Sequence, residues 1–326
     1  MKSASNLVSA DVAGAGAMDV AAISPRQADR SAASGVRTSS VSRAVPPKLV
    51  CILGVGRTGT NHLATVLSKV PGIDSRRELF NPDRIWMMHP HELAEIARRV
   101  GKPLPCSPED RQTINAIRRQ PGLALDCLVD LMAPERRVLV FKVFRDQLSV
   151  RQVKKAIISR PDTAIVFIRR RPIDTYVSHR KAGRINKWVK VDTTQMKVEI
   201  DPRKYLRWWR QTTAWYRGLE AACWSMGKPF HEMTYEEDIA ASPVTGARRF
   251  CDILEECGLE PFALPEDDPE LGLTRQDRTD DVRARMANWP EFERHLSARR
   301  SLDKAFEAIP HFQPSRLDRL RRSLLS

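Results

Sequence analysis

The residues with the clearest chemical potential lie in the segment VCILGVGRTGTNHLATVL, residues 50–67. An apolar run ends at Leu53, the glycines Gly54, Gly56 and Gly59 follow, and apolar residues then recur with helical spacing. This order is typical of a phosphate-binding loop, in which the unpaired N–H groups at a helix start and the helix dipole attract an anion. The sequence therefore predicts an anion site between a strand and a helix.

The side chains of this loop favour an anion other than a magnesium-bound triphosphate. A loop for magnesium nucleotides carries a lysine for the outer phosphates and a hydroxyl for the metal. Here Thr60 stands at the lysine position and Asn61 at the hydroxyl position, while the cation comes earlier, as Arg57. We expect Arg57, Thr58, Gly59, Thr60 and Asn61 to bind the anion. The alternative is a glycine turn with an incidental arginine.

A second group of residues lies in FIRRRPIDTYVSHRKAG, at the end of another apolar run. Arg170 stands at the mouth of that run, and Ser178 follows eight residues later, about two helical turns on. If a helix begins after Pro172, Ser178 faces back toward the sheet. Arg170 and Ser178 would then converge on a second phosphate. The alternative is an arginine-rich joint between a strand and a helix.

The elements that must position these residues can be read from the apolar pattern. Near-continuous apolar or β-branched runs predict strands over 49–53, 138–144 and 163–170, and KPFHEMTYEE predicts a short one. Helical spacing predicts helices between them. Two lie within 88–132, of which the second uses Ser107 and Pro108 as its start, one lies over 203–224, and one begins after Ser242. The fold class is therefore α/β: a three-layer, P-loop-like parallel sheet flanked by helices, with helical insertions. Ligands of such sheets bind at the carboxyl ends of the strands, where the glycine loop lies.

Composition narrows the class of protein. Of 326 residues, 54 are Lys or Arg and 40 Asp or Glu, which gives a net charge of +14. This excess suits an anionic ligand, but no zinc-finger or basic-zipper pattern accompanies it, so we expect no nucleic-acid partner. Six cysteines without a C-x-x-C pair indicate a reducing, cytoplasmic location. No H-E-x-x-H motif is present, so we expect no metal.

The chain is predicted to divide into two parts. Residues 1–46 are rich in alanine and serine and are predicted to be disordered, and 47–326 form one domain. No apolar run reaches the ~20 residues of a membrane span. The basic segment SRLDRLRRSLL could contact an acidic membrane surface or pack against the domain.

Together the two motifs resemble those of sulfotransferases that use 3′-phosphoadenosine 5′-phosphosulfate (PAPS), nearest the bacterial carbohydrate-type branch. GVGRTGT resembles the family's G-x-x-R-[ST]-G-[ST] loop, and RRPIDTYVS resembles its R-x-P element with a serine eight positions after the arginine. Weaker similarities, in SRRELFNP and RQDRTDDVRARMANWPEF, extend the resemblance over roughly residues 48–300. It implies that the loop binds the 5′-phosphosulfate and that Arg170 and Ser178 bind the 3′-phosphate.

The resemblance also implies a mechanism. A phosphosulfate needs no metal bridge, and Arg57 can stabilise charge on the bridging oxygen as the sulfuryl group leaves. Glu78 is implied as the general base for an acceptor hydroxyl, unless it merely pairs with Arg76 or Arg77. His62 is the second candidate base.

Three further groups have two interpretations each. Lys142 is either an extra cation in the site or an edge lysine, and a late loop either touches the cofactor or is solvated. The tryptophans of 203–224 either stack on a sugar or belong to the core. The residues concerned, besides Lys142, are Arg275, Gln276, Arg278, Trp208, Trp209 and Trp215.

Two other functions stay open. A P-loop kinase or nucleotide hydrolase would bind magnesium ATP and use Asp146 as a metal ligand. A non-enzymatic polyanion binder would bind weakly and with strong salt dependence. The acceptor of a sulfotransferase could be a carbohydrate, a glycolipid or a small hydroxylated metabolite, and the sequence indicates no oligomeric state.

Overall fold

The computed structural model describes residues 46–188, 191–315 and 319. The predicted disordered segment 1–46 and the basic segment SRLDRLRRSLL therefore lie almost entirely outside the described residues, and both stay predictions.

Five parallel strands form a single sheet. They are β1 (Leu49–Gly54), β2 (Ile73–Ser75), β3 (Val138–Phe144), β4 (Thr163–Arg169) and β5 (His231–Thr234). Their order across the sheet is β2-β3-β1-β4-β5, and Val50 of β1 pairs with Val140 of β3 and Ala164 of β4. Every residue of the three central strands is buried, which explains their near-continuous apolar sequences. The predicted α/β fold is confirmed.

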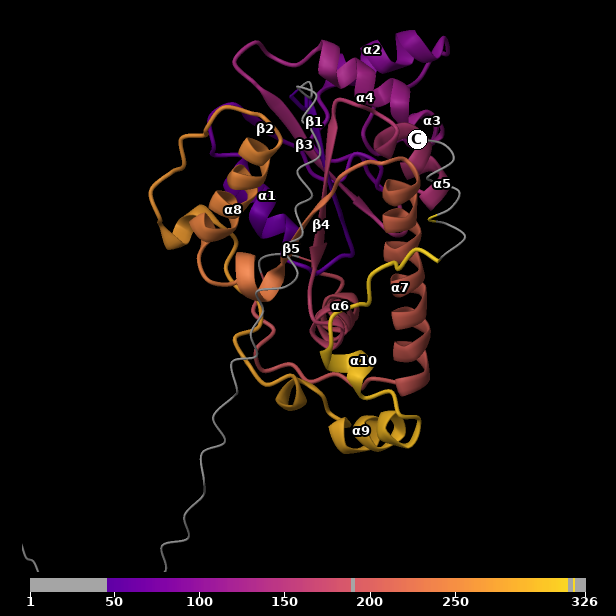
Figure 1. The fold of residues 1–326 in the computed structure, drawn as a ribbon, viewed down its shortest axis with the longest axis vertical. Helices are drawn as coiled ribbons and strands as arrows, with labels where there is room; N and C mark the ends of the chain where they lie inside the picture. Colours follow the sequence, from indigo (N-terminus) through magenta and orange to yellow (C-terminus); the bar gives the residue numbers. More distant parts are fainter. Residues whose placement is uncertain (1–45, 189–190, 316–318, 320–326) are drawn as a thin grey trace, which may run out of the picture. The chain divides into compact units, whose positions relative to one another are not determined.

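Helices cover both faces of this sheet. They are α1 (Thr60–Leu67), α2 (Pro90–Val100), α3 (Arg111–Arg119), α4 (Pro121–Asp130), α5 (Val150–Val153), α6 (Pro172–Ile185), α7 (Pro202–Ser225), α8 (Pro243–Glu256), α9 (Trp289–Ala298) and α10 (Asp303–Phe306). Single π-helical turns follow α5 and β5, over Lys154–Ile158 and Tyr235–Ile239, and short 3₁₀ turns span Pro269–Leu271 and Arg283–Arg285. Figure 1 shows α1 and α8 on one side of the sheet and α7, with α3 to α5, on the other.

The alternation of side chains along β1 explains the two faces. Leu49, Cys51 and Leu53 pack into a core with residues of α2 to α5 and α7, whereas Val50 and Ile52 pack with α1 and α8. A third apolar cluster joins α6, the start of α7, α9 and α10. The sheet's carboxyl edge is thereby held rigidly between packed helices.

Helix starts follow the local capping chemistry, with one correction. The side chain of Ser242 accepts a hydrogen bond from the Thr245 N–H at 3.2 Å at the start of α8, as predicted. Ser107, however, does not cap α3, so that prediction is wrong. The helix starts at Arg111, and Asp110 accepts the Thr113 N–H at 2.8 Å, because Ser107 to Asp110 form a turn of their own.

No helix in the described ranges is both long and apolar enough to cross a membrane.

Candidate functional site

The loop between β1 and α1 has two residues in the left-handed backbone region. Gly59 has φ 82°, and a Cβ there would lie 2.6 Å from the Tyr235 ring, so glycine is required. Arg57, with φ 77°, adopts this conformation despite its side chain. The Thr58 hydroxyl donates to the Val55 carbonyl at 2.9 Å. Thr58 therefore shapes the loop with its hydroxyl, whereas Thr60 and Asn61 line a cavity in front of it.

That cavity has a volume of about 820 Å³ and opens at the carboxyl end of the sheet. Its walls come from the β1–α1 loop, the segment after β2, the end of β4 and the middle of α6, the start of α8, and the loop before α9. Volume and lining suit a nucleotide and a second ligand together. The site residues predicted from the sequence, apart from Thr58, all line it: Arg57, Gly59, Thr60, Asn61, Glu78, Arg170 and Ser178.

Arg57 connects the loop to distant parts of the chain. Its Nε donates to the Ser178 Oγ at 3.0 Å, and its terminal nitrogens donate to the Trp188 carbonyl and to the Gln276 side chain. Burial, and then the charge of Arg170, lower the pKa of Arg57 to about 10. Two guanidinium groups thus lie close together in a partly desolvated place, which favours an anionic ligand between them.

Arg170 and Ser178 converge as their spacing predicts. Arg170 donates to the Arg57 carbonyl at 2.8 Å, and its guanidinium lies 4.0 Å from the centroid of the Tyr235 ring. Helix α6 begins at Pro172 and carries Ser178 to the same cavity wall. Burial lowers the pKa of Arg170.

Three donors in this wall have no hydrogen-bond partner within the described part of the chain. They are the Nε atoms of Arg170 and Arg285 and the Nε2 of Gln276, all buried. Unpaired buried donors are rare because each loses its hydrogen bonds to water, at about 1–3 kcal/mol. All three residues line the cavity, but these donor atoms themselves are covered, so an anion there would bind them only after the side chains shift.

The Glu78 carboxylate is held by two side-chain hydrogen bonds and lies near a lysine. Its Oε2 accepts from Asn81 at 2.8 Å and from Gln147 at 2.9 Å, and its Oε1 lies 3.6 Å from the Lys142 Nζ. The alternative pairing with Arg76 is wrong, because that arginine instead binds Asp74 and Glu92 at 2.7 and 2.8 Å. No Glu78 pairing with Arg77 is present among the described residues either.

Lys142 is a buried cation of the site, so the edge interpretation is wrong. Strand β3 lies between β2 and β1, and Lys142 has an exposed fraction of 0%. Its Nζ donates to the Asn61 Oδ1 as well as approaching Glu78. Burial lowers its pKa to about 8, against the opposing effect of the Glu78 charge. Lys142 therefore connects the anion loop to the carboxylate.

His62 is engaged with the late loop. Its Nδ1 lies 3.0 Å from both the carbonyl and the N–H of Leu273. It lines the cavity together with Glu78, so both candidate bases border the same space and His62 stays the second candidate.

Of the three candidate residues in the late loop, one is bonded to the β1–α1 loop. Gln276 receives the Arg57 hydrogen bond, whereas Arg275 pairs with Asp280 at 2.9 Å and only borders the cavity. Arg278 pairs with Asp192 at 2.6 Å and stands outside the cavity wall that the described residues form.

Sequence reasoning missed several cavity residues. Tyr235, His179, Trp86 and Trp188 all line it. Tyr235 follows β5 directly, so its position after a predicted strand was a usable signal. His179 adjoins Ser178, and burial together with Arg57 lowers its pKa, which keeps the ring neutral. Asp146 also reaches the cavity, as the kinase alternative requires.

The predicted tryptophan stripe belongs to the core. Trp215 is buried, and Trp208 and Trp209 pack against the apolar clusters. The sugar-stacking interpretation for these three residues therefore has no support, since they lie outside the described cavity wall.

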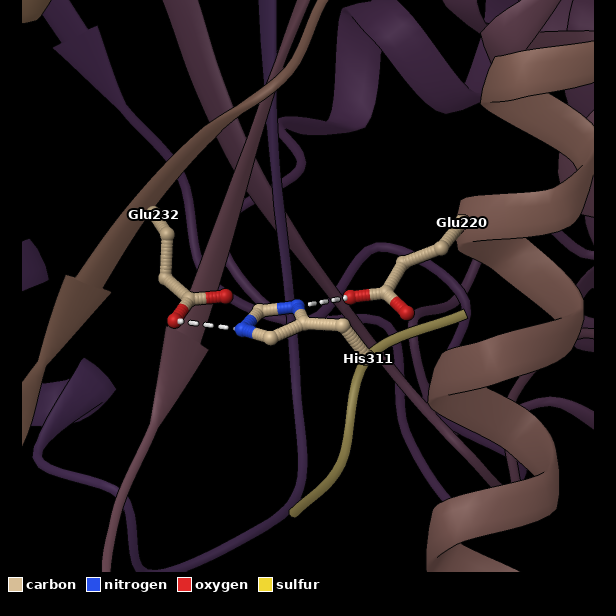
Figure 2. Close-up of side chains that lie close together, drawn as sticks. All are labelled: Glu220, Glu232 and His311. Carbon is tan, nitrogen blue, oxygen red and sulfur yellow. Dashed lines mark hydrogen bonds and ion pairs between the residues drawn. The ribbon is translucent and has the colours of Figure 1, made fainter. Parts of the chain in front are cut away.

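A separate cluster could suggest a metal site. Figure 2 shows the His311 ring between the carboxylates of Glu220 on α7 and Glu232 on β5, at 2.8 and 3.6 Å. The buried guanidinium of Arg169 already pairs with both carboxylates, to Glu232 at 2.6 Å. A divalent cation would lie against this fixed positive charge, so we interpret the cluster as an ion-pair network.

The comparisons with known proteins agree with the two motifs. A family model described as "Sulfotransferase family" matches residues 47–261. The search of curated proteins found no match.

Three solved structures are similar to this chain at a TM-score of 0.37 each. A sulfotransferase from Alicyclobacillus acidocaldarius has 18% identity and covers 70% of this chain and 88% of its own. The sulfotransferase domain of the Synechococcus PCC 7002 olefin synthase has 15% identity, over 88% and 97%. Mouse sulfotransferase SULT7A1, complexed with PAP, has 14% identity, over 87% and 90%. At these scores the family match alone carries the assignment.

Proposed function

The chain belongs to the sulfotransferase family, and on that premise we propose that it transfers a sulfuryl group from PAPS to the hydroxyl of an acceptor. The observation that carries the choice of donor is the group of buried, unpartnered donors of Arg170, Arg285 and Gln276 in the cavity wall. Arg170 and Gln276 both bond to Arg57, which also donates to Ser178. The N–H groups at the start of α1 are a second set of donors in the same cavity. A donor with two separate anionic groups would use both places.

Glu78 acts as the general base in this proposal. It takes the proton of the acceptor hydroxyl as that oxygen bonds to sulfur, and the bond from sulfur to the bridging phosphate oxygen breaks. The sulfated acceptor and adenosine 3′,5′-bisphosphate are the products. The hydrogen bonds from Asn81 and Gln147 hold the Glu78 carboxylate in one orientation, which is what positioning for an in-line attack requires.

Arg57 and the N–H groups of the loop stabilise the charge that develops on the leaving oxygen. Because Lys142 contacts both Asn61 and Glu78, it holds the loop and the base in register. Its charge also attracts the Glu78 carboxylate, whose Oε1 lies 3.6 Å from the Lys142 Nζ.

Several finer predictions belong to this proposal. They are the carbohydrate-type branch, a reaction without metal, and a cytoplasmic location. The kinase alternative rests on Asp146 in the cavity wall, and it differs by requiring magnesium.

The test is calorimetric titration with adenosine 3′,5′-bisphosphate, and with ATP with and without magnesium. We expect micromolar binding of the bisphosphate in the presence of a chelator, and at least a tenfold loss in Arg170→Ala, from the loss of hydrogen bonds to a charged group. Arg278→Ala, which removes a cation paired outside the cavity, is the matched control and should bind normally.

Two results would contradict the proposal. Preference for magnesium ATP would favour the kinase. Binding that disappears with moderate salt, equally in both arginine variants, would indicate a polyanion binder.

A further inference from the structure

Exposed tryptophans gather in the cavity. The chain has seven tryptophans, of which the structure leaves two exposed: Trp86, at 37%, and Trp188, at 43%. Both line the cavity, while the other five are buried or half-buried. A large apolar surface left in water at a binding site indicates that a ligand covers it.

Trp86 belongs to a segment whose backbone is bonded to the proposed base. Its backbone N–H donates to the Glu78 backbone carbonyl at 3.3 Å, so the chain returns to the backbone of Glu78. The preceding residue, Ile85, is buried and donates to the Pro108 carbonyl at 2.8 Å. The guanidinium of Arg84 lies 4.8 Å from the centroid of the indole. The indole is thus carried by a segment bonded to the Glu78 backbone, and both residues line the cavity that an acceptor hydroxyl must enter.

Trp188 belongs to a different side of the cavity. Its carbonyl accepts a hydrogen bond from Arg57, and its ring lies 5.3 Å from that of His179, the neighbour of Ser178. These contacts place it with the residues proposed for the donor. Trp86 is therefore the tryptophan available to an acceptor.

Charged side chains share the cavity lining with Trp86. Arg77, Asp83 and Asp146 line the cavity with Trp86 and Glu78. A flat apolar surface beside charged side chains suits a saturated ring that offers C–H groups on its face and hydroxyls around its edge. A phenol or an alkyl chain would cover the indole but displace water from the charged groups without offering them hydrogen bonds, which is unfavourable.

We propose that Trp86 is the platform on which the acceptor stacks, and that the reacting hydroxyl is carried by a polyhydroxylated ring. This inference rests on the proposed function, since it assigns the second ligand of the same cavity. A pyranoside and a cyclitol share the required chemistry, and the experiment distinguishes them.

The first experiment measures sulfuryl transfer from labelled PAPS to four probes: methyl β-glucopyranoside, myo-inositol, 2-naphthol and 1-octanol. We expect transfer to the pyranoside or the cyclitol, whichever is the source of the ring, and little to the other two. Preferential transfer to 2-naphthol or 1-octanol, or transfer to none of the four, would overturn the proposal.

The second experiment compares variants with the better ring acceptor. Trp86→Ala should raise the acceptor KM about tenfold or more, because aromatic contact and burial are both lost. Trp86→Phe should restore part of it, and Leu131→Ala, which removes a side chain of similar exposure (38%) outside the cavity, should change nothing. The affinity for adenosine 3′,5′-bisphosphate should stay within twofold in all three.

The outcomes separate the two proposals. If the unaltered protein does not bind the bisphosphate, the proposed function fails. If it binds the bisphosphate normally but Trp86→Ala leaves the acceptor KM unchanged, or weakens the bisphosphate as much as the acceptor, only the role of Trp86 fails.

Discussion

Deprotonation of Lys142 by raising the pH is a perturbation whose size follows from the site geometry. Its pKa is lowered by burial from the ordinary 10.5 to about 8. The side chain is therefore about 90% charged at pH 7 and about 10% charged at pH 9. If the charge on Lys142 supports Glu78 and Asn61 as proposed, kcat/KM should fall roughly tenfold across this range.

Stability should change in the opposite direction. Because the folded state disfavours the charged form of Lys142, its unfavourable contribution is full below pH 8 and disappears as the pH rises to 10.5. The unfolding free energy should rise across this range by on the order of 3 kcal/mol from this group. Falling activity with rising stability is a combination that general alkaline denaturation does not produce.

Lys142→Met is the control for both effects. The variant should have low kcat/KM at pH 7, without the limb near pH 8. Its unfolding free energy, from urea melts at pH 7 to 10.5, should lack the rise seen in the unaltered protein. The reasoning is refuted if the two proteins give parallel pH–stability curves, or if the unaltered protein keeps full turnover to pH 9.5.

Three further predictions use other parts of the structure. Glu78→Gln should lower kcat by about 10²- to 10⁴-fold with normal bisphosphate affinity in calorimetry, and undiminished turnover would remove Glu78 from the role of base. Gly59→Ala should cost roughly 2 kcal/mol or more in urea unfolding, since its Cβ would meet Tyr235, whereas Gly101→Ala, with φ 70° and open space, should cost only about 1; equal losses would contradict the clash. The hydrogen bond with Glu220 raises the pKa of His311, so protonated His311 stabilises the folded protein. That stabilisation is full below pH 6.5 and is lost as the pH rises through the pKa of His311 in the folded protein. His311→Ala should therefore flatten the dependence of the melting temperature on pH in this range, and an unchanged dependence would show that the pair contributes nothing to stability.

The sequence allowed the fold to be predicted wherever one local signal was sufficient. Apolar runs located the three central strands because both of their faces are buried, and Ser242 located a helix start because capping is local. The prediction for Ser107 was wrong because its capping was also judged from the local sequence, without the turn that Ser107 to Asp110 form. Two candidates of equal capping quality stood three residues apart, and tertiary context decided between them.

The site was predictable to the extent that its spacing was local. Arg170 and Ser178 share one strand–helix joint, so eight residues sufficed to place them together. The Lys142–Glu78 pair and the Arg57–Gln276 contact join segments far apart in the chain, and no spacing rule could reveal them. Trp86 was missed because an exposed tryptophan in a loop belongs to no sequence pattern. Its position in the cavity wall is visible only in the structure.

The strand order also determines how long β1 lacks its partner strands while the chain is being synthesised. Leu49 of β1 pairs with Leu139 and with Thr163, so both neighbours of this apolar strand are made long after it. At about 5–20 residues per second, translation leaves β1 without either partner for about 5–18 seconds and without the second for about 6–23 seconds. The strand that carries the anion loop is therefore an apolar segment that stays unpaired on the nascent chain until β3 and β4 have been made.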